Sequence, residues 1–221
     1  MAKLSLSPSI SLIFPALAAL CFLAETSPAQ AQTFGVRYAD LGGFYARTHG
    51  GGDTFDTYGG NFQLNFPLIE ENTELGPFGL DLRNQYSNTF DNESGVSLEG
   101  HRVAAGPLLY FPLQEDLRPF ATALLGHTFS RFRSDGGPTE KDNTWTYAVG
   151  VGFEWLPIER LSIAPRIAYA NSFSGGRDSM QYGAETDYWI NDQFSLGVGY
   201  NYFSTSDDFT HDLVLRTRIR F

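Results

Sequence analysis

The last eleven residues, 211–221, constrain the fold more than any other part of the chain. One parity of this segment carries Leu213, Leu215, Thr217, Ile219 and Phe221, and the other carries Val214, Arg216, Arg218 and Arg220. Successive side chains of a β-strand point to opposite faces, so this alternation predicts a strand with one apolar face and one cationic face. An apolar face of this kind suits lipid, whereas the cationic face suits a polar interior.

The same period of two recurs along the chain. The large apolar members of the clearest segments are Tyr58, Phe62, Leu64 and Phe66, then Phe78, Leu80 and Leu82, then Trp145, Tyr147, Val149, Val151, Phe153 and Trp155, then Leu161, Ile163, Ile167 and Tyr169, and finally Phe194, Leu196, Val198, Tyr200 and Tyr202. Small or polar residues alternate with them. Long alternating segments of this type are typical of strands that face lipid on one side and a lumen on the other.

The closing strand resembles that of Gram-negative outer-membrane β-barrel proteins, of the small porin-like or OmpA type, because it ends on Phe221 after alternating apolar residues. The resemblance implies that Leu213, Leu215, Ile219 and Phe221 form the assembly signal read by the barrel-assembly machinery. It also implies that periplasmic chaperones take part in biogenesis, and that outer-membrane lipid and lipopolysaccharide surround the folded protein. The expected location is the cell outer membrane.

The N-terminal segment has the features of a secretory signal peptide. Lys3 is followed by a short apolar stretch from Ile10 to Leu23, and Ala29-Gln30-Ala31 forms a cleavage site of the A-x-A type. We therefore expect residues 1–31 to be a cleaved signal peptide for export through the Sec pathway, and residues 32–221 to form the barrel. The net charge of −10 argues against nucleic acid as a partner.

Prolines and aromatic residues indicate where the strands end. Pro67, Pro112 and Pro157 each follow an aromatic strand end, which fits because proline cannot join the strand ladder. The predicted membrane girdle at these ends consists of Phe66, Phe111, Trp155 and Trp189. The fold class predicted is all-β: a closed antiparallel up-and-down transmembrane β-barrel of ten strands, with eight as the fallback. Both termini are expected in the periplasm, and the opposite rim is expected to carry mostly longer loops at 49–57, 88–97, 134–143, 172–179 and 204–210.

Two segments fit the alternation less well. From Phe34 to Arg47 the apolar parity begins with Phe34, Val36 and Tyr38 but would then place Asp40 outward, which suggests a β-bulge near Gly42 and Gly43. From Phe120 to Arg133 apolar residues occupy both parities, so its faces are not assigned. A soluble β-sandwich also alternates, but its outer face would be rich in charged residues rather than in the Gly and Ala found here.

Charged residues of both signs fall on the expected lumen faces. The lumen or constriction candidates are Arg37, Asp81, Arg83, Glu154, Arg166, Glu185, Asp187, Arg216, Arg218 and Arg220. They form either a charged constriction that selects solutes or a network of ion pairs that fills a narrow barrel. The second interpretation is favoured, because side chains nearly fill barrels of this size.

Neither a metal site nor a catalytic site is predicted. The expected external loops are acidic, with Asp53, Asp56, Asp91, Glu93, Asp135, Glu140, Asp142, Asp178, Asp207 and Asp208, but they lack the spacing of a calcium loop. The group Asp207, Asp208, His211 and Asp212 loosely resembles the acid and histidine sites of omptin proteases, and His127 with Ser130 loosely resembles the outer-membrane lipid A deacylase. In a strand, residues i and i+3 face opposite sides, so the second pair cannot form a dyad.

The function predicted is an integral outer-membrane β-barrel, porin-like or structural, with a narrow lumen lined by charges and no cofactor. An outer-membrane enzyme that modifies lipid A or cleaves proteins, and a surface adhesin that uses the acidic loops, remain as alternatives.

Overall fold

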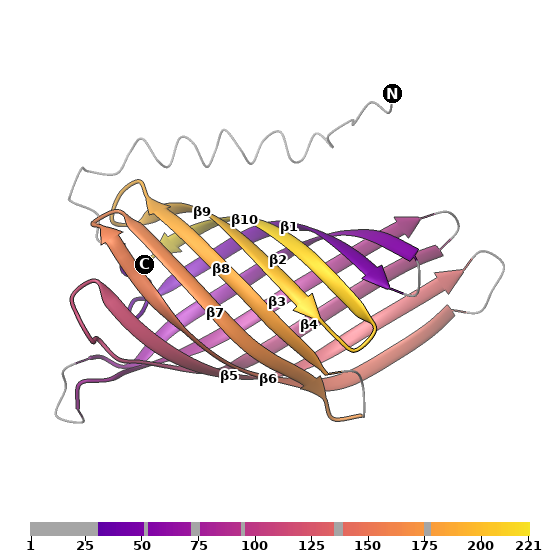
Figure 1. The fold of residues 1–221 in the computed structure, drawn as a ribbon, viewed down its shortest axis with the longest axis horizontal. Helices are drawn as coiled ribbons and strands as arrows, with labels where there is room; N and C mark the ends of the chain where they lie inside the picture. Colours follow the sequence, from indigo (N-terminus) through magenta and orange to yellow (C-terminus); the bar gives the residue numbers. More distant parts are fainter. Residues whose placement is uncertain (1–30, 51–52, 72–75, 94–95, 135–138, 175–177) are drawn as a thin grey trace.

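Ten antiparallel strands close on themselves to form a barrel (Figure 1). The computed structural model describes residues 31–50, 53–71, 76–93, 96–134, 139–174 and 178–221. The strands are β1 (Tyr38–Gly50), β2 (Asp53–Ile69), β3 (Gly79–Glu93), β4 (Val96–Tyr110), β5 (Leu117–Ser134), β6 (Thr139–Ile158), β7 (Leu161–Ser172), β8 (Ser179–Trp189), β9 (Phe194–Ser204) and β10 (Asp208–Arg220). Within these ranges no helix is long and apolar enough to cross a membrane.

Every strand pairs with its neighbours in sequence, and β1 pairs with β10 to close the ring. The closing register runs without interruption from Tyr38 opposite Arg220 to Gly50 opposite Asp208. The up-and-down barrel of ten strands is therefore confirmed, and the fallback of eight is wrong. Closure satisfies the backbone of every strand on both edges, so no strand edge is left open.

The outer surface of the barrel is apolar and its interior is polar. Large apolar side chains of the alternating strands, such as Leu125, Val151 and Leu215, are exposed on the outside. Asn65, Asp81, Glu154, Asp187 and Arg218 are buried on the inside. This is the reverse of a β-sandwich, in which the large apolar residues fill the core.

The two irregular segments of the sequence have simple explanations. The predicted bulge near Gly42 and Gly43 is wrong, because both ladders of β1 continue through these residues without a shift. Tyr38 and Asp40 both point inward, so the charged residue does not require the strand to change face. In β5, Leu125 and Phe129 are exposed on the outside, whereas Phe120 is buried within the barrel.

The barrel has two rims, which we call the terminal rim, where β1 begins and β10 ends, and the distal rim at the other end. The predicted long loops at the distal rim are wrong in their extent, because the strands continue through most of them. Arg47 pairs with Asp56, for example, and Asp91 pairs with Leu98. Ladder hydrogen bonds satisfy these backbones, so the polar composition of the segments did not prevent strand formation.

Candidate functional site

The terminal half of the lumen is crossed by residues 31–36, which we call the strap. The ring of Phe34 packs against those of Tyr110 and Phe120, with centroids 5.6 and 5.1 Å away. The guanidinium of Arg83 lies 5.5 Å from the Phe34 ring centre, on the lumen side of β3. Gly35 has a positive φ of 73°, which glycine adopts more readily than other residues, and this lets the chain turn beside Tyr110.

Polar side chains of the barrel wall hold the backbone of the strap. The amide of Thr33 donates to Glu154 at 2.9 Å, and the Thr33 hydroxyl donates to the same carboxylate oxygen. The amide of Gly35 donates to Asp81 at 3.1 Å. The side-chain amide of Asn65 donates to the carbonyl of Val36 at 2.9 Å. These groups come from three different strands, so the strap is bound across the mouth of the barrel.

Further anchors lie at the N-terminal end of the strap. Arg220 donates to the carbonyl of Gln32, and its guanidinium stacks on the ring of Trp189 at 3.5 Å. The amide of Ala31, the last residue of the expected signal peptide, donates to the carbonyl of Glu159 at 2.6 Å. The strap thus extends from the start of β1 to the wall formed by β6, where Glu154 binds Thr33.

Beyond the strap, three arginines and three carboxylates form an ion network. Arg216 donates to Asp187 at 2.6 and 3.0 Å and to Glu185 at 2.5 Å. Arg218 bridges Asp187 at 3.1 Å and Asp40 at 3.0 Å. Arg166 completes the network by donating to Glu185 at 2.5 Å. The charges balance, which is what burial of ionic groups requires.

The strap and the ion network together close the lumen. The cavity left between them has a volume of about 10 Å³ and is lined by residues of both, including Phe34, Arg83 and Arg218. A water molecule needs roughly 10–15 Å³, so this space holds one water at most. The strap and the ion network thus leave little open space where they meet.

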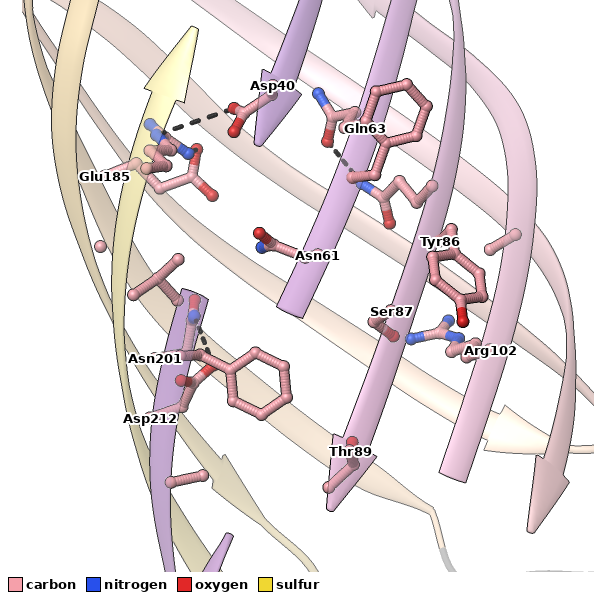
Figure 2. A pocket seen from close by; sticks show the side chains of 18 of the residues that line it. Asp40, Asn61, Gln63, Tyr86, Ser87, Thr89, Arg102, Glu185, Asn201 and Asp212 are labelled. Atoms are coloured by element: carbon pink, nitrogen blue, oxygen red, sulfur yellow. Dashed lines mark hydrogen bonds and ion pairs between the residues drawn. The ribbon is translucent and has the colours of Figure 1, made fainter. Parts of the chain in front are cut away.

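The distal half of the lumen contains a larger cavity, which we call the vestibule (Figure 2). Its volume is about 350 Å³, and its walls are mostly polar. A chain of hydrogen bonds runs along one wall, from the side-chain amide of Gln85 to Gln63 and from Gln63 to the hydroxyl of Tyr38, each at 2.8 Å. The vestibule begins at the ion network, at Asp40 and Glu185, and extends toward the distal rim.

Two charged groups on the vestibule wall form no direct ion pair with a described residue. Arg102 forms no ion pair with any described residue, and its Nε lacks a hydrogen-bond partner among them. Asp212 accepts one hydrogen bond from Asn201 at 3.2 Å, while its other carboxylate oxygen has no partner in the described part of the chain. Figure 2 shows Arg102 and Asp212 on opposite sides of the vestibule.

The structure places all but one of the predicted lumen residues on the inside. Arg37 is the exception: it is exposed and precedes β1, because the inward parity belongs to Tyr38 and Asp40. The others fall into two groups. Arg166, Glu185, Asp187, Arg216 and Arg218 form the ion network, whereas Asp81, Arg83, Glu154 and Arg220 contact the strap.

Three of the four predicted girdle residues lie on the outer wall. Phe66 has the outward parity of Tyr58, and Phe111 and Trp155 are exposed on the outside. The prediction that Trp189 belongs to the girdle is wrong, because its side chain is fully buried and packs against Ala31 of the strap. Its neighbour Tyr188 has the outward parity and is exposed. The assembly-signal residues Leu213, Leu215, Ile219 and Phe221 all lie exposed on the outer surface.

The two enzyme-like groups do not assemble. On the outer face, a hydrogen bond of 2.6 Å joins Nδ1 of His211 to the hydroxyl of Tyr200. Asp212, the next residue, points into the vestibule instead. His127 packs on Trp145 outside the barrel, on the parity opposite to Ser130.

The predicted acidic positions do not form a cluster. Asp56 pairs with Arg47 at 2.7 Å, Asp135 lies outside the described residues, and the side chains of Asp53 and Glu93 are not described. Within the described ranges, no group of three acidic, histidine or cysteine side chains could hold a metal ion.

Sequence reasoning missed the strap and the vestibule charges. Residues 33–36 alternate as if they began a strand, and nothing in their composition distinguishes a segment that enters the lumen. The segment of Arg102 was not assigned to faces, and Asp212, which shares the lumen parity of Arg216, was considered only as part of a protease-like group. Asp40 was the one indication in the sequence that the faces of this first segment had been exchanged. An acid on the expected lipid face argues that this face is in fact the lumen face.

The closed antiparallel ladder, the apolar exterior and the charged, polar interior define the class of the protein: a β-barrel of the kind found in outer membranes. No protein-family model and no curated protein matches the chain.

Solved structures show the same fold. The β-domain of the Bordetella autotransporter BrkA is 11% identical with a TM-score of 0.54, and the match covers 84% of this chain and 100% of that one. The transport unit of the autotransporter AIDA-I from Escherichia coli is 13% identical with a TM-score of 0.53, and the match covers 96% of this chain and 97% of that one. The translocator domain of NalP from Neisseria meningitidis is 8% identical with a TM-score of 0.53, covering all of both chains. At these identities the likeness shows the fold alone.

Proposed function

We propose that this protein is an integral outer-membrane β-barrel with a closed lumen, a structural barrel rather than an open pore. The observation that carries the proposal is the pair of obstructions in the lumen, the strap and the ion network, with about 10 Å³ between them. Every component of the network is matched by an opposite charge at hydrogen-bond distance. Such a network is too ordered and too dehydrated to serve as an aqueous path.

Three observations support the location. Large apolar side chains cover the outer wall, aromatic residues lie toward both ends of that wall, and the structural neighbours are outer-membrane barrels. The terminal rim would face the periplasm and the distal rim the outside, in agreement with the expected signal peptide. Outer-membrane lipid would then surround the barrel, and the assembly machinery would recognise its closing strand.

Single-channel recording of the purified protein in a planar bilayer tests the closed lumen. The natural protein should give no steady conductance steps, although it inserts and resists unfolding in detergent at room temperature. A variant that removes one pair of the network, Asp187→Ser with Arg218→Ser, should give small steps, because water would enter the space once occupied by both side chains. Arg37→Ser is the matched control, because Arg37 is exposed outside the lumen.

Reproducible conductance of the natural protein would overturn the closed-barrel proposal. Silence of the paired variant would show that the strap alone closes the lumen, and Phe34→Ala in the same background would then be required to open it.

A porin-like role is the second candidate, and the vestibule is the observation that favours it. Arg102 and Asp212 face each other across this cavity and form no direct ion pair with a described residue, so they create a field across the lumen. If the strap moves aside in the membrane, this field would select permeating ions. In the opened variant, Arg102→Glu should then shift the selectivity toward cations, as measured by the reversal potential in a salt gradient.

We propose no enzymatic activity and no cofactor. The support is geometric: the histidines considered for catalysis lie on the outer face, separated by the barrel wall from the nearby serine or carboxylate. An adhesive role of the distal acidic residues is not favoured by any contact described above.

A further inference from the structure

A cluster of cations faces outward at the distal end of two adjacent strands. Arg131 and Arg133 belong to β5, and Lys141 belongs to β6. All three are exposed. In the strand register, Arg131 lies between Glu99 of β4 and Lys141, so these three side chains share one row of the outer wall. We call Arg131, Arg133 and Lys141 the cationic patch.

The patch carries an excess of positive charge. Glu99 contacts Arg131 at 3.7 Å and His101 at 3.1 Å, and it is shared between them. Lys141 and Arg133 form no ion pair with the described residues. By contrast, Arg47, an outward arginine on β1 near the same rim, is matched by both oxygens of Asp56 at 2.7 and 2.8 Å. In a chain with a net charge of −10, unmatched cations on one outward face are the exception.

Large aromatic residues lie directly below the patch on the same outer wall. Phe129 precedes Arg131 by two residues on β5, and Trp145 follows Lys141 by four residues on β6. Each strand residue advances roughly 3.3 Å, so Arg131 lies about 7 Å beyond Phe129. Aromatic rings of this kind lie at the membrane interface, which places the cations at the level of the lipid headgroups.

The outer wall is hollowed at this point. A hollow of about 220 Å³ is lined by the polar side chains of Glu99, His101, Ser130, Arg131, Lys141 and Asn143 and by the ring of Phe129. A guanidinium and an ammonium on two sides of such a hollow suit a phosphate group, because the guanidinium can donate two parallel hydrogen bonds and the ammonium adds a point charge. The ring below suits the apolar face of a sugar or the start of an acyl chain.

We propose that the cationic patch binds the phosphate groups of the lipid A headgroup of lipopolysaccharide in the outer leaflet. Arg131 and Lys141 hold one phosphate over the hollow, and Arg133 strengthens the field from the next row. Glu99 limits the affinity, because it competes with the phosphate for Arg131. This inference rests on the proposed location and orientation, since only the distal rim would meet lipopolysaccharide.

The test measures binding of lipid A to the folded protein in detergent by native mass spectrometry, with diphosphorylated and dephosphorylated lipid A as probes. For the diphosphorylated lipid we expect the Arg131→Gln, Lys141→Gln variant to bind at least tenfold more weakly than the natural protein. Arg47→Gln is the matched control and should bind as the natural protein does, because Arg47 is already neutralised. Dephosphorylated lipid A should bind all three equally.

A variant expected to bind lipid A more tightly provides a second test. Glu99→Gln removes the competing carboxylate, so this variant should bind diphosphorylated lipid A several-fold more tightly than the natural protein. Equal binding by the natural protein, the double variant and Glu99→Gln would overturn the inference. Loss of binding in Arg47→Gln to the same extent as in the double variant would also overturn it, because the effect would then be one of net charge.

Insertion of the natural protein into phospholipid vesicles is measured separately. A natural protein that stays soluble without lipid or detergent would refute the proposed location itself. A protein that inserts but shows no dependence on the patch would refute only the lipid A site.

Discussion

Asp187 is the residue on which the lumen network depends most. Both Arg216 and Arg218 donate to it, and its side chain is almost completely buried. A buried carboxylate with two guanidinium partners is costly to neutralise, because the three arginines of the network would remain in the barrel with only Glu185 and Asp40 to balance them. The same reasoning applies with less force to Glu185, which is nearer to the open vestibule.

Asp187→Asn should therefore lower the free energy of unfolding by about 3 kcal/mol or more, the range found when one partner of a buried pair is removed. Urea titration of the protein in phospholipid vesicles, followed by tryptophan emission, measures this change. The control is Asp178→Asn, which removes an exposed carboxylate near the start of the same strand and should change stability by no more than about 0.5 kcal/mol. Equal effects of the two substitutions would show that the network does not stabilise the barrel.

The three tryptophans occupy three different environments. Trp145 and Trp155 are 55% and 43% exposed on the outer wall, near opposite rims, whereas Trp189 is 0% exposed and lies beneath Arg220. The difference follows from parity: Trp155 lies on the outward parity of its strand and Trp189 on the inward parity.

Single-tryptophan variants should separate these environments. In vesicles of brominated phospholipid, the emission of Trp145 and Trp155 should be quenched, because their rings meet the acyl chains or the interface. The emission of Trp189 should be unchanged, since the barrel wall separates it from lipid. Strong quenching of Trp189 would contradict its inward position.

At the scale of elements, the strap differs from every strand because side chains of the wall, rather than a neighbouring ladder, bind its backbone at Gln32, Thr33, Gly35 and Val36. Glu154 alone accepts from the amide and hydroxyl of Thr33 and from the hydroxyl of Ser162 at 2.9 Å. A hydrogen bond to a charged acceptor contributes about 1.5–3 kcal/mol, so removing this charge should loosen the strap more than the wall.

Glu154→Gln should accelerate hydrogen exchange at the Thr33 amide by about tenfold, which corresponds to roughly 1.4 kcal/mol of lost protection. Exchange in β8 and β9 should stay as it is in the natural protein. The matched control is Glu115→Gln, an exposed acid near the terminal rim, which should leave Thr33 protected. If Thr33 exchanges at the rate of a free peptide in the natural protein, the strap does not occupy the lumen in solution.

The strands were predictable from the sequence, whereas the strap was not. Alternation identifies a strand because each outward residue meets lipid and each inward residue meets the lumen, as for Phe153 and Glu154. The strap obeys no such rule, since Thr33, Phe34 and Ala31 are all buried. Its position depends on acceptors such as Asp81 and Glu154 that are distant in sequence, and a single sequence does not reveal that pairing.

The whole molecule depends on the seam between the first and last strands. The register there pairs Ala39 with Ile219 and Gly43 with Leu215 on the outer face. The number of strands followed from the alternation together with the proline and aromatic strand ends, and the inward positions of most lumen charges followed from the alternation. The length of the distal connections did not, because polar residues in a regular ladder look like loop residues in a sequence.

A cross-link across the seam tests the register of the closed barrel. Cysteines at Ala39→Cys and Ile219→Cys should be joined in high yield by a short bis-maleimide in the folded protein, and the denatured product should migrate anomalously because its ends are connected. Ala39→Cys with Val198→Cys should not be joined, because β1 and β9 are separated by β10. Cross-linking of the second pair at a similar yield would exclude the register described.

The course of the strap has a mechanical consequence. It runs from β1, across the mouth, to Glu154 of β6, which binds Thr33, and in a ring of ten strands β6 is the strand farthest from β1. A hollow cylinder under lateral pressure from a bilayer deforms most easily by flattening into an oval. A segment fixed at both ends of one diameter resists the stretching of that diameter, as a tie-rod does. Residues 31–36 thus act as a brace that keeps the cross-section round at the end where the lumen is most densely packed.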